Sequence, residues 1–117
     1  MTTSGNPTVR WTVEPGDRST VVHVGGEIDL ATHAEFDKAV RAGMDSGAPV
    51  VILNLGEVTF LGSVGLRVLV QANHETQQTG RTLRVVHGTA IVRRIIEVTG
   101  LEQVLSLYPT LQQAQST

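Results

Sequence analysis

An apolar run at residues 50–55, VVILNL, constrains the fold of this chain more than any other feature. Five of its six residues are apolar and half are β-branched, which is typical of a strand covered on both faces. Segments with helical periodicity stand on either side of it, after Thr32 and after Gly62. Strands that alternate with helices favour parallel pairing through right-handed crossovers. The run therefore predicts an α/β fold built on a central buried strand.

Four further segments have the pattern of strands: residues 9–13, 20–24, 83–86 and, as a short edge strand, 104–107. The first two are joined by a short turn with the sequence EPGD, so we expect them to pair antiparallel. The glycine pair that follows residue 24 lets the backbone bend. Together the segments predict a single mixed β-sheet with helices packed against it.

The first helix is predicted to follow Thr32 and to stop near Gly47. Thr32 with Glu35 three residues later fits a capping box. We expect the inward faces of the three main helices to carry apolar residues at helical spacing. These are Phe36, Val40 and Met44 in the first helix, Val64, Val68 and Ala72 flanked by Leu69 in the second, and Ile91, Ile95 and Val98 in the third.

Length and composition exclude several classes of protein. The 117 residues suit one domain, which we expect over residues 9–114 after a flexible N-terminal tail at 1–8. A net charge of −2 gives no basic field for nucleic acid. No apolar run approaches the roughly 18 residues of a membrane span, and no signal peptide is evident, so we expect a cytoplasmic protein. The chain has no cysteine, which rules out thiolate catalysis and cysteine-ligated zinc.

Two segments at the carboxyl ends of predicted strands are the best candidates for a functional site, residues 26–32 and 58–66. Ser63 opens the second predicted helix. Its hydroxyl could cap the helix by accepting backbone bonds. Alternatively, a phosphate there would be tolerated by the positive helix end, and its charge would disrupt a docked partner.

Spacing argues against an enzyme at the same segment. A nucleophile elbow needs glycine two residues before the serine, but Leu61 stands there, and no P-loop or G-x-G-x-x-G is present. The four histidines are scattered without metal-ligand spacing, so we expect no metal and no cofactor. We interpret His87 as a polar loop residue, and we expect Asp29 to accept backbone hydrogen bonds in its turn.

Four separated motifs together resemble the STAS domain of anti-sigma-factor antagonists. They are GEIDLAT at 26–32, VILNL at 51–55, VTFLGSVGL at 58–66 and VTGL at 98–101. The resemblance runs from about residue 9 to about residue 114 without a large insertion.

The resemblance implies a partner and a switch. Members of the family bind an anti-sigma factor, often a serine kinase, and so free a sigma factor for transcription. Phosphorylation of one serine at the start of the second helix breaks that complex, and a phosphatase restores it. This serine corresponds to Ser63. The implied partner-binding residues are Asp29, Thr32, Phe60, Leu61, Gly62, Ser63, Val64, Gly65 and Arg67.

The chain departs from the family pattern around the acceptor serine. The usual run is DSSGLG, whereas residues 62–67 are GSVGLR. Gly62 removes an acidic side chain, Val64 replaces a small polar side chain with a stiff apolar one, and Arg67 adds a charge one helical turn past Ser63 that could pair with a phosphate or an acidic partner. These departures leave open a constitutive interaction module without phosphorylation. A covered sheet with helix N-termini also leaves open a small nucleotide-binding protein.

Overall fold

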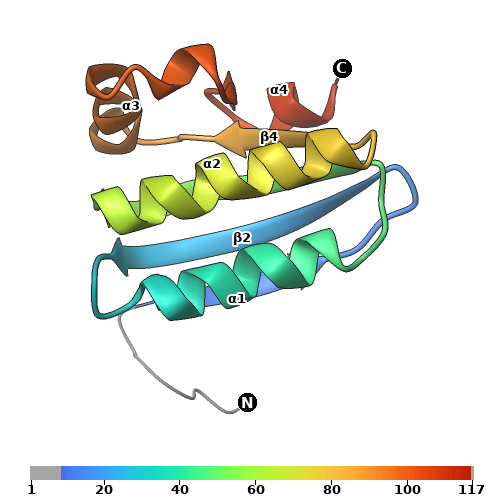
Figure 1. Ribbon diagram of the computed structural model, residues 1–117, viewed down its shortest axis with the longest axis horizontal. Coiled ribbons are helices and arrows are strands. Elements are labelled where there is room, and N and C mark those ends of the chain that lie inside the picture. Colours follow the sequence, from blue (N-terminus) through green and yellow to red (C-terminus); the bar gives the residue numbers. More distant parts are fainter. Residues whose placement is uncertain (1–8, 117) are drawn as a thin grey trace.

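The computed structural model describes residues 9–116 as one sheet with helices on both faces (Figure 1). The predicted tail at residues 1–8 lies outside the described residues. The elements in chain order are β1 (Val9–Glu14), β2 (Ser19–Ile28), α1 (His33–Met44), β3 (Val50–Leu61), α2 (Ser63–Gln78), β4 (Thr82–Val86), α3 (Ala90–Val98), the 3-10 helix η1 (Leu101–Gln103), β5 (Ser106–Tyr108) and α4 (Leu111–Gln115).

The five strands lie in the sheet in the order in which they occur along the chain. β1 pairs with β2 antiparallel, and the pairs β2–β3, β3–β4 and β4–β5 are parallel. The prediction of a single mixed sheet, with its first two strands antiparallel, is therefore confirmed. The parallel strands direct their carboxyl ends, and hence the starts of α1, α2 and α3, to the same edge of the sheet.

One face of the sheet carries the larger core, beneath α1 and α2, which lie side by side across it (Figure 1). β3 contributes Val51, Leu53 and Leu55, all fully buried, and α1 contributes Phe36 and Val40 on its predicted inward face. Burying each such side chain is worth about 1.5–3 kcal/mol. The apolar run that predicted a central strand thus forms the middle of this core.

The opposite face is covered more thinly, by the short helix α4. Its core consists of four buried residues, namely Val21 of β2, Ile52 of β3, Val86 of β4 and Ala114 of α4. Ile52 shows that β3 is buried on both faces, as its composition predicts. The adjacent far-face residues Val50 and Asn54 are only half-buried, so coverage on this side is partial.

The predicted inward faces of α2 and α3 are wrong in part. α2 buries Leu66 and Leu69, and α3 buries Val92 and Ile96. By contrast, Ile91 and Val98 of α3 are exposed, and Val64 and Val68 of α2 are half-buried. Both helices carry apolar residues around more than one stripe, so periodicity alone does not select the buried stripe.

β2 and β3 extend beyond their predicted ends into both candidate segments. β2 continues to Ile28 and β3 continues to Leu61, and the two stay paired up to the Ile28–Leu61 position. Two register shifts, one between His23 and Gly25 and one between Gly26 and Glu27, accompany this extension. The predicted strand at 50–55 is therefore too short, and residues 58–61, including Phe60, belong to β3.

Candidate functional site

The turn from β2 into α1 is closed by its own side chains. The Asp29 Oδ1 atom accepts hydrogen bonds from the backbone N–H groups of Ala31 at 3.0 Å and Thr32 at 3.1 Å, as expected. The Thr32 hydroxyl lies 2.8 Å from the Glu27 carbonyl, to which it donates, and accepts from the Asp29 N–H at 2.9 Å. The connection into the first turn of α1 is thereby cross-linked by the side chains of Asp29 and Thr32.

The predicted capping box at this turn is wrong. Thr32 is the N-cap residue of α1, but its side chain makes no capping hydrogen bond to the helix, since its hydroxyl serves the turn. Glu35 is engaged elsewhere, because its carboxylate accepts a hydrogen bond at 2.9 Å from the Trp11 indole N–H. That bond ties β1 to α1.

Among the described residues, the hydrogen bonds that hold the turn from β3 into α2 come from the backbone and none from a side chain. The Gly62 N–H donates to the Ile28 carbonyl at 2.8 Å, and the Gly62 carbonyl accepts from Gly65 and Leu66. A Cβ atom on Gly65 would lie 2.6 Å from the Leu61 Cδ1 atom and 2.7 Å from the Ile28 Cγ2 atom. Glycine at 65 therefore lets α2 approach the paired ends of β2 and β3.

Ser63 is the first residue of α2, and Gly62 occupies the N-cap position. The interpretation of Ser63 as the helix cap is therefore wrong. Its side chain is exposed, and within residues 9–116 its hydroxyl makes no hydrogen bond. The backbone N–H groups of Ser63 and Val64 likewise have no partner in this part of the chain. The helix thus presents an exposed hydroxyl beside unsatisfied donors at its positive end.

Two exposed apolar side chains flank Ser63. Phe60 near the end of β3 is 46% exposed, and Leu30, two residues past the end of β2, is 77% exposed. Gly62 lies between the two strand ends, since a Cβ atom on this glycine would lie 3.4 Å from the Phe60 ring and 3.8 Å from the Asp29 Cα atom. Sequence reasoning missed Leu30. An apolar residue inside a polar turn was the available signal.

The predicted partner-binding set divides by burial. Phe60, Ser63 and Arg67 are exposed, and Asp29, Gly62 and Val64 are half-buried. Thr32, Leu61 and Gly65 are buried, so in this structure they support the surface and present almost nothing to a partner. We define the Ser63 surface as Asp29, Leu30, Phe60, Gly62, Ser63, Val64 and Arg67.

The turn from β4 into α3 lies at the same edge of the sheet. The Thr89 hydroxyl caps α3 by accepting from the Val92 N–H at 3.3 Å. His87 is buried, contrary to the interpretation of an ordinary polar loop residue, and its Nδ1 atom has no hydrogen-bond partner among the described residues. Burial and the nearby charge of Arg93 lower the pKa of His87, although the charge of Glu97 acts in the opposite direction. The lowered pKa favours the neutral ring.

The part of the chain that the structure describes contains no group of three His, Cys, Asp or Glu side chains able to hold a metal ion. Over the same residues, none of the helices has the length and apolar character to cross a membrane.

Comparison with known protein families agrees with this architecture. The family model described as the STAS domain matches residues 10–114. The chain belongs to the STAS domain family. The match includes the Ser63 surface and all five strands except the first residue of β1.

Named relatives of this STAS chain are regulators. The anti-sigma-F factor antagonist RsfB of Mycobacterium tuberculosis is 34% identical over 94 residues, which cover 80% of this chain and 76% of RsfB. A crystal structure of an anti-sigma factor antagonist from Mycobacterium paratuberculosis is 36% identical, with a TM-score of 0.83 and 94% of each chain covered.

A more distant solved structure shares the STAS fold alone. The anti-sigma factor antagonist SpoIIAA in its unphosphorylated form is 18% identical, with a TM-score of 0.66, and the match covers 90% of this chain and 92% of SpoIIAA. A structure of the Bacillus cell fate determinant SpoIIAA in its phosphorylated form is also similar in fold.

Proposed function

We propose that this chain is an anti-sigma factor antagonist that binds a kinase-type anti-sigma factor through the Ser63 surface and is released by phosphorylation of Ser63. The observation that carries the proposal is the exposed hydroxyl of Ser63, which makes no hydrogen bond within residues 9–116, at a helix start without a side-chain cap. Relatives above 30% identity are named anti-sigma factor antagonists, which supports the class of partner.

The geometry suits a docking surface that phosphorylation can disrupt. Leu30 and Phe60 supply exposed apolar area next to Ser63, and the core of a protein interface is typically apolar with few charges. A phosphate would add about −1.5 to −2 charges at the centre of this surface. Burying that charge against a partner would cost much more free energy than burying the neutral hydroxyl of serine.

The start of α2 would accommodate a phosphate on Ser63 in the free chain. The backbone N–H groups of Ser63 and Val64 have no hydrogen-bond partner among the described residues. Arg67 stands one helical turn later on the same side of α2, where it can pair with the phosphate. Phosphorylation would thus weaken binding without unfolding α2. A phosphatase that removes the phosphate would restore binding. The role is regulatory and not enzymatic, and we place it in the cytoplasm, where transcription occurs.

Binding measurements with the cognate anti-sigma factor test this proposal. We expect Ser63→Asp to weaken the complex at least tenfold, about 1.4 kcal/mol, in isothermal titration calorimetry. Ser106→Asp is the matched control, because Ser106 is an exposed serine on the edge strand β5, outside the Ser63 surface. Undiminished affinity in Ser63→Asp would contradict the proposal.

A kinase assay distinguishes the phosphorylation switch from a constitutive interaction module. The departures at Gly62 and Val64 favour the constitutive module. The complex is incubated with ATP, and the modified residue is mapped by mass spectrometry. We expect one phosphate, on Ser63, and dissociation of the complex. A complex that forms normally and is unchanged by ATP would instead support the constitutive module.

A further inference from the structure

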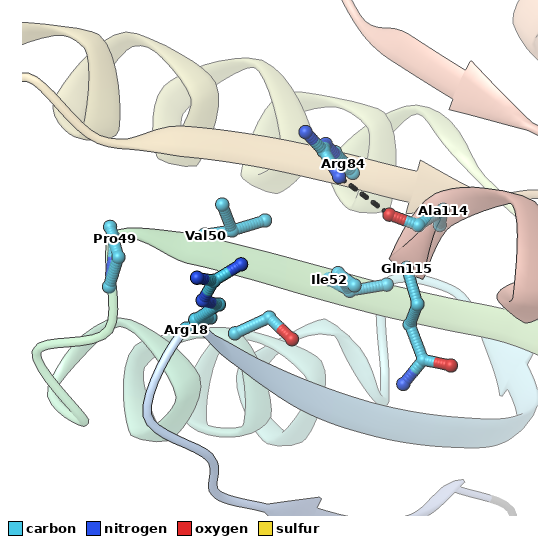
Figure 2. A pocket seen from close by; sticks show the side chains of 8 residues that line it. Arg18, Pro49, Val50, Ile52, Arg84, Ala114 and Gln115 are labelled. Carbon is cyan, nitrogen blue, oxygen red and sulfur yellow. Dashed lines mark hydrogen bonds between the residues drawn. The ribbon is translucent and has the colours of Figure 1, made fainter. Parts of the chain in front are cut away.

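The two edges of the sheet are closed to different degrees. β5, at one edge, has only three residues. The chain turns from it directly into α4, whose Ala114 carbonyl accepts a hydrogen bond from Arg84 of the neighbouring strand at 2.6 Å, beside a pocket on that face (Figure 2). β1, at the other edge, has six residues and pairs with β2 alone within residues 9–116. Alternate backbone groups of β1 therefore point away from the sheet and have no partner in this part of the chain.

β1 carries none of the features that usually block an exposed edge. Proteins protect edge strands with proline, lysine, a bulge or a short length. The sequence of β1, VRWTVE, contains neither proline nor lysine, and its register with β2 runs unbroken from Val9 to Glu14. The edge is therefore suited to pairing with another strand.

The two faces of β1 differ in chemistry. Trp11 and Val13 pack against the larger core but are only half-buried, so apolar area remains at the edge. Arg10, Thr12 and Glu14 are exposed and share the opposite face, because successive residues of a strand face opposite ways. A strand that pairs with this edge must therefore match one cation and one anion on one face and an apolar pair on the other.

A second copy of β1 meets these requirements in one antiparallel register. Outward-pointing residues must lie opposite each other, and in β1 these are alternate residues, so a two-fold axis must be centred on a residue. Centring it on Thr12 places Arg10 opposite Glu14 of the second copy, and Trp11 opposite Val13, each twice. Centring it on Trp11 or Val13 leaves a charged residue opposite Thr12, and centring it on Arg10 or Glu14 places like charges opposite each other. Charge complementarity thus selects the register centred on Thr12.

Both charged groups have capacity for the additional contact. Arg10 donates from Nη2 to the Glu57 carboxylate at 3.1 Å, and a guanidinium has several further N–H donors. The Glu14 Oε1 atom lies 2.9 Å from the His23 Nε2 atom, whereas its Oε2 atom makes no hydrogen bond within residues 9–116. Arg10 and Glu14 of two copies can therefore pair without loss of the contacts that each already makes.

We propose that two copies of this chain associate through β1 as an antiparallel pair centred on Thr12, which joins their sheets into one. The interface pairs each Arg10 with Glu14 of the other copy and covers the half-buried Trp11 and Val13. It makes no use of the Ser63 surface, so it can fail without affecting the proposed function.

Charge reversal with mixing tests the register. Sedimentation equilibrium of the full chain should show a reversible monomer–dimer equilibrium. Arg10→Glu or Glu14→Arg alone places like charges opposite each other twice per dimer, and we expect each to raise the dissociation constant about tenfold or more. An equimolar mixture of the two variants has opposite charges at both positions again, so heterodimers should form with close to the parent affinity. Arg94→Glu, which reverses an exposed charge on α3, should leave the dissociation constant unchanged.

A cross-link tests the position of the two-fold axis. The chain has no cysteine, so Thr12→Cys introduces a single thiol. The proposed register places this thiol opposite its own copy, within reach of a disulfide, and oxidation should give a covalent dimer. Ser106→Cys on the edge strand β5 is the matched control and should cross-link far more slowly.

Three results would overturn the proposal. One is a parent chain that stays monomeric up to millimolar concentration. Another is a mixture of Arg10→Glu and Glu14→Arg that associates no better than either variant alone. A third is faster cross-linking of Ser106→Cys than of Thr12→Cys, which would place the contact at β5. The cross-link decides the matter even if a charge-reversed variant fails to fold.

Discussion

Two neighbouring helix starts at one edge of the sheet are built in opposite ways. The turn into α1 is cross-linked by side chains, since the Asp29 carboxylate and the Thr32 hydroxyl together accept from three backbone N–H groups. The turn into α2 has glycine at the N-cap and leaves the Ser63 hydroxyl and two backbone donors unbonded within the described residues. The contrast indicates that the first turn serves stability, whereas the second is left open for an incoming group.

The largest effect on stability should come from adding a side chain at Gly65, where α2 packs closely against the ends of β2 and β3. Gly65→Val would place a side chain within 3 Å of Leu61 and Ile28, so we expect a loss of about 2–3 kcal/mol from the free energy of unfolding. Urea denaturation measures it. Gln71→Val, on the exposed side of the same helix, carries the same β-branched penalty without the clash and should cost below about 1 kcal/mol. Equal losses in the two variants would refute the packing argument.

A smaller effect should follow from opening the closed turn. Asp29→Ala removes the acceptor for two backbone N–H groups, and we expect it to cost about 1–2 kcal/mol. Ser63→Ala in the open turn should change stability by less than about 0.5 kcal/mol, because its hydroxyl has no bond to lose within residues 9–116. Thermal or urea unfolding of both variants compares the turns directly. The contrast fails if Ser63→Ala is the more destabilising.

The smallest effect, and a gain, should come from closing the open turn. Gly62→Asp supplies a cap and a negative charge at the start of α2, and we expect about 0.5 kcal/mol of stabilisation. The backbone at Gly62 has φ of −82°, and a Cβ there meets only ordinary contacts at 3.4 Å or more, so an aspartate fits. Urea denaturation measures the gain. A loss of stability would show that the turn requires glycine.

Local pattern predicted much of this protein because its main elements differ sharply in composition. α3 spans Ala90–Val98 and so contains the three residues predicted for the third helix, Ile91, Ile95 and Val98. β4 begins one residue earlier than predicted, at Thr82. The α2 start at Ser63 also followed from the change of periodicity after Gly62. Prediction failed where local pattern allowed two answers. In α3 the branched apolar residues form two overlapping stripes, and packing against the sheet buried Val92 and Ile96 instead of Ile91 and Val98.

At the candidate site, too, local pattern predicted some features and tertiary packing decided the others. The motif placed Ser63 at a helix start, but it could not separate exposed from buried neighbours. Thr32, Leu61 and Gly65 turned out to be buried, and Leu30 exposed. Pairing of β2 and β3 up to the Ile28–Leu61 position extended both strands beyond their predicted ends at residues 24 and 55. That pairing depends on residues more than thirty positions apart, which no local pattern contains.

The sequence by itself determined the order of the elements, the buried central strand and the position of Ser63 at the head of a helix. These depend on spacing along the chain, which a single sequence contains in full. Only the tertiary structure decided which side of α2 and α3 is buried, which residues make up the Ser63 surface, and that β1 forms an edge of the sheet. Those features depend on distances between separate elements, and these are set when the elements pack together.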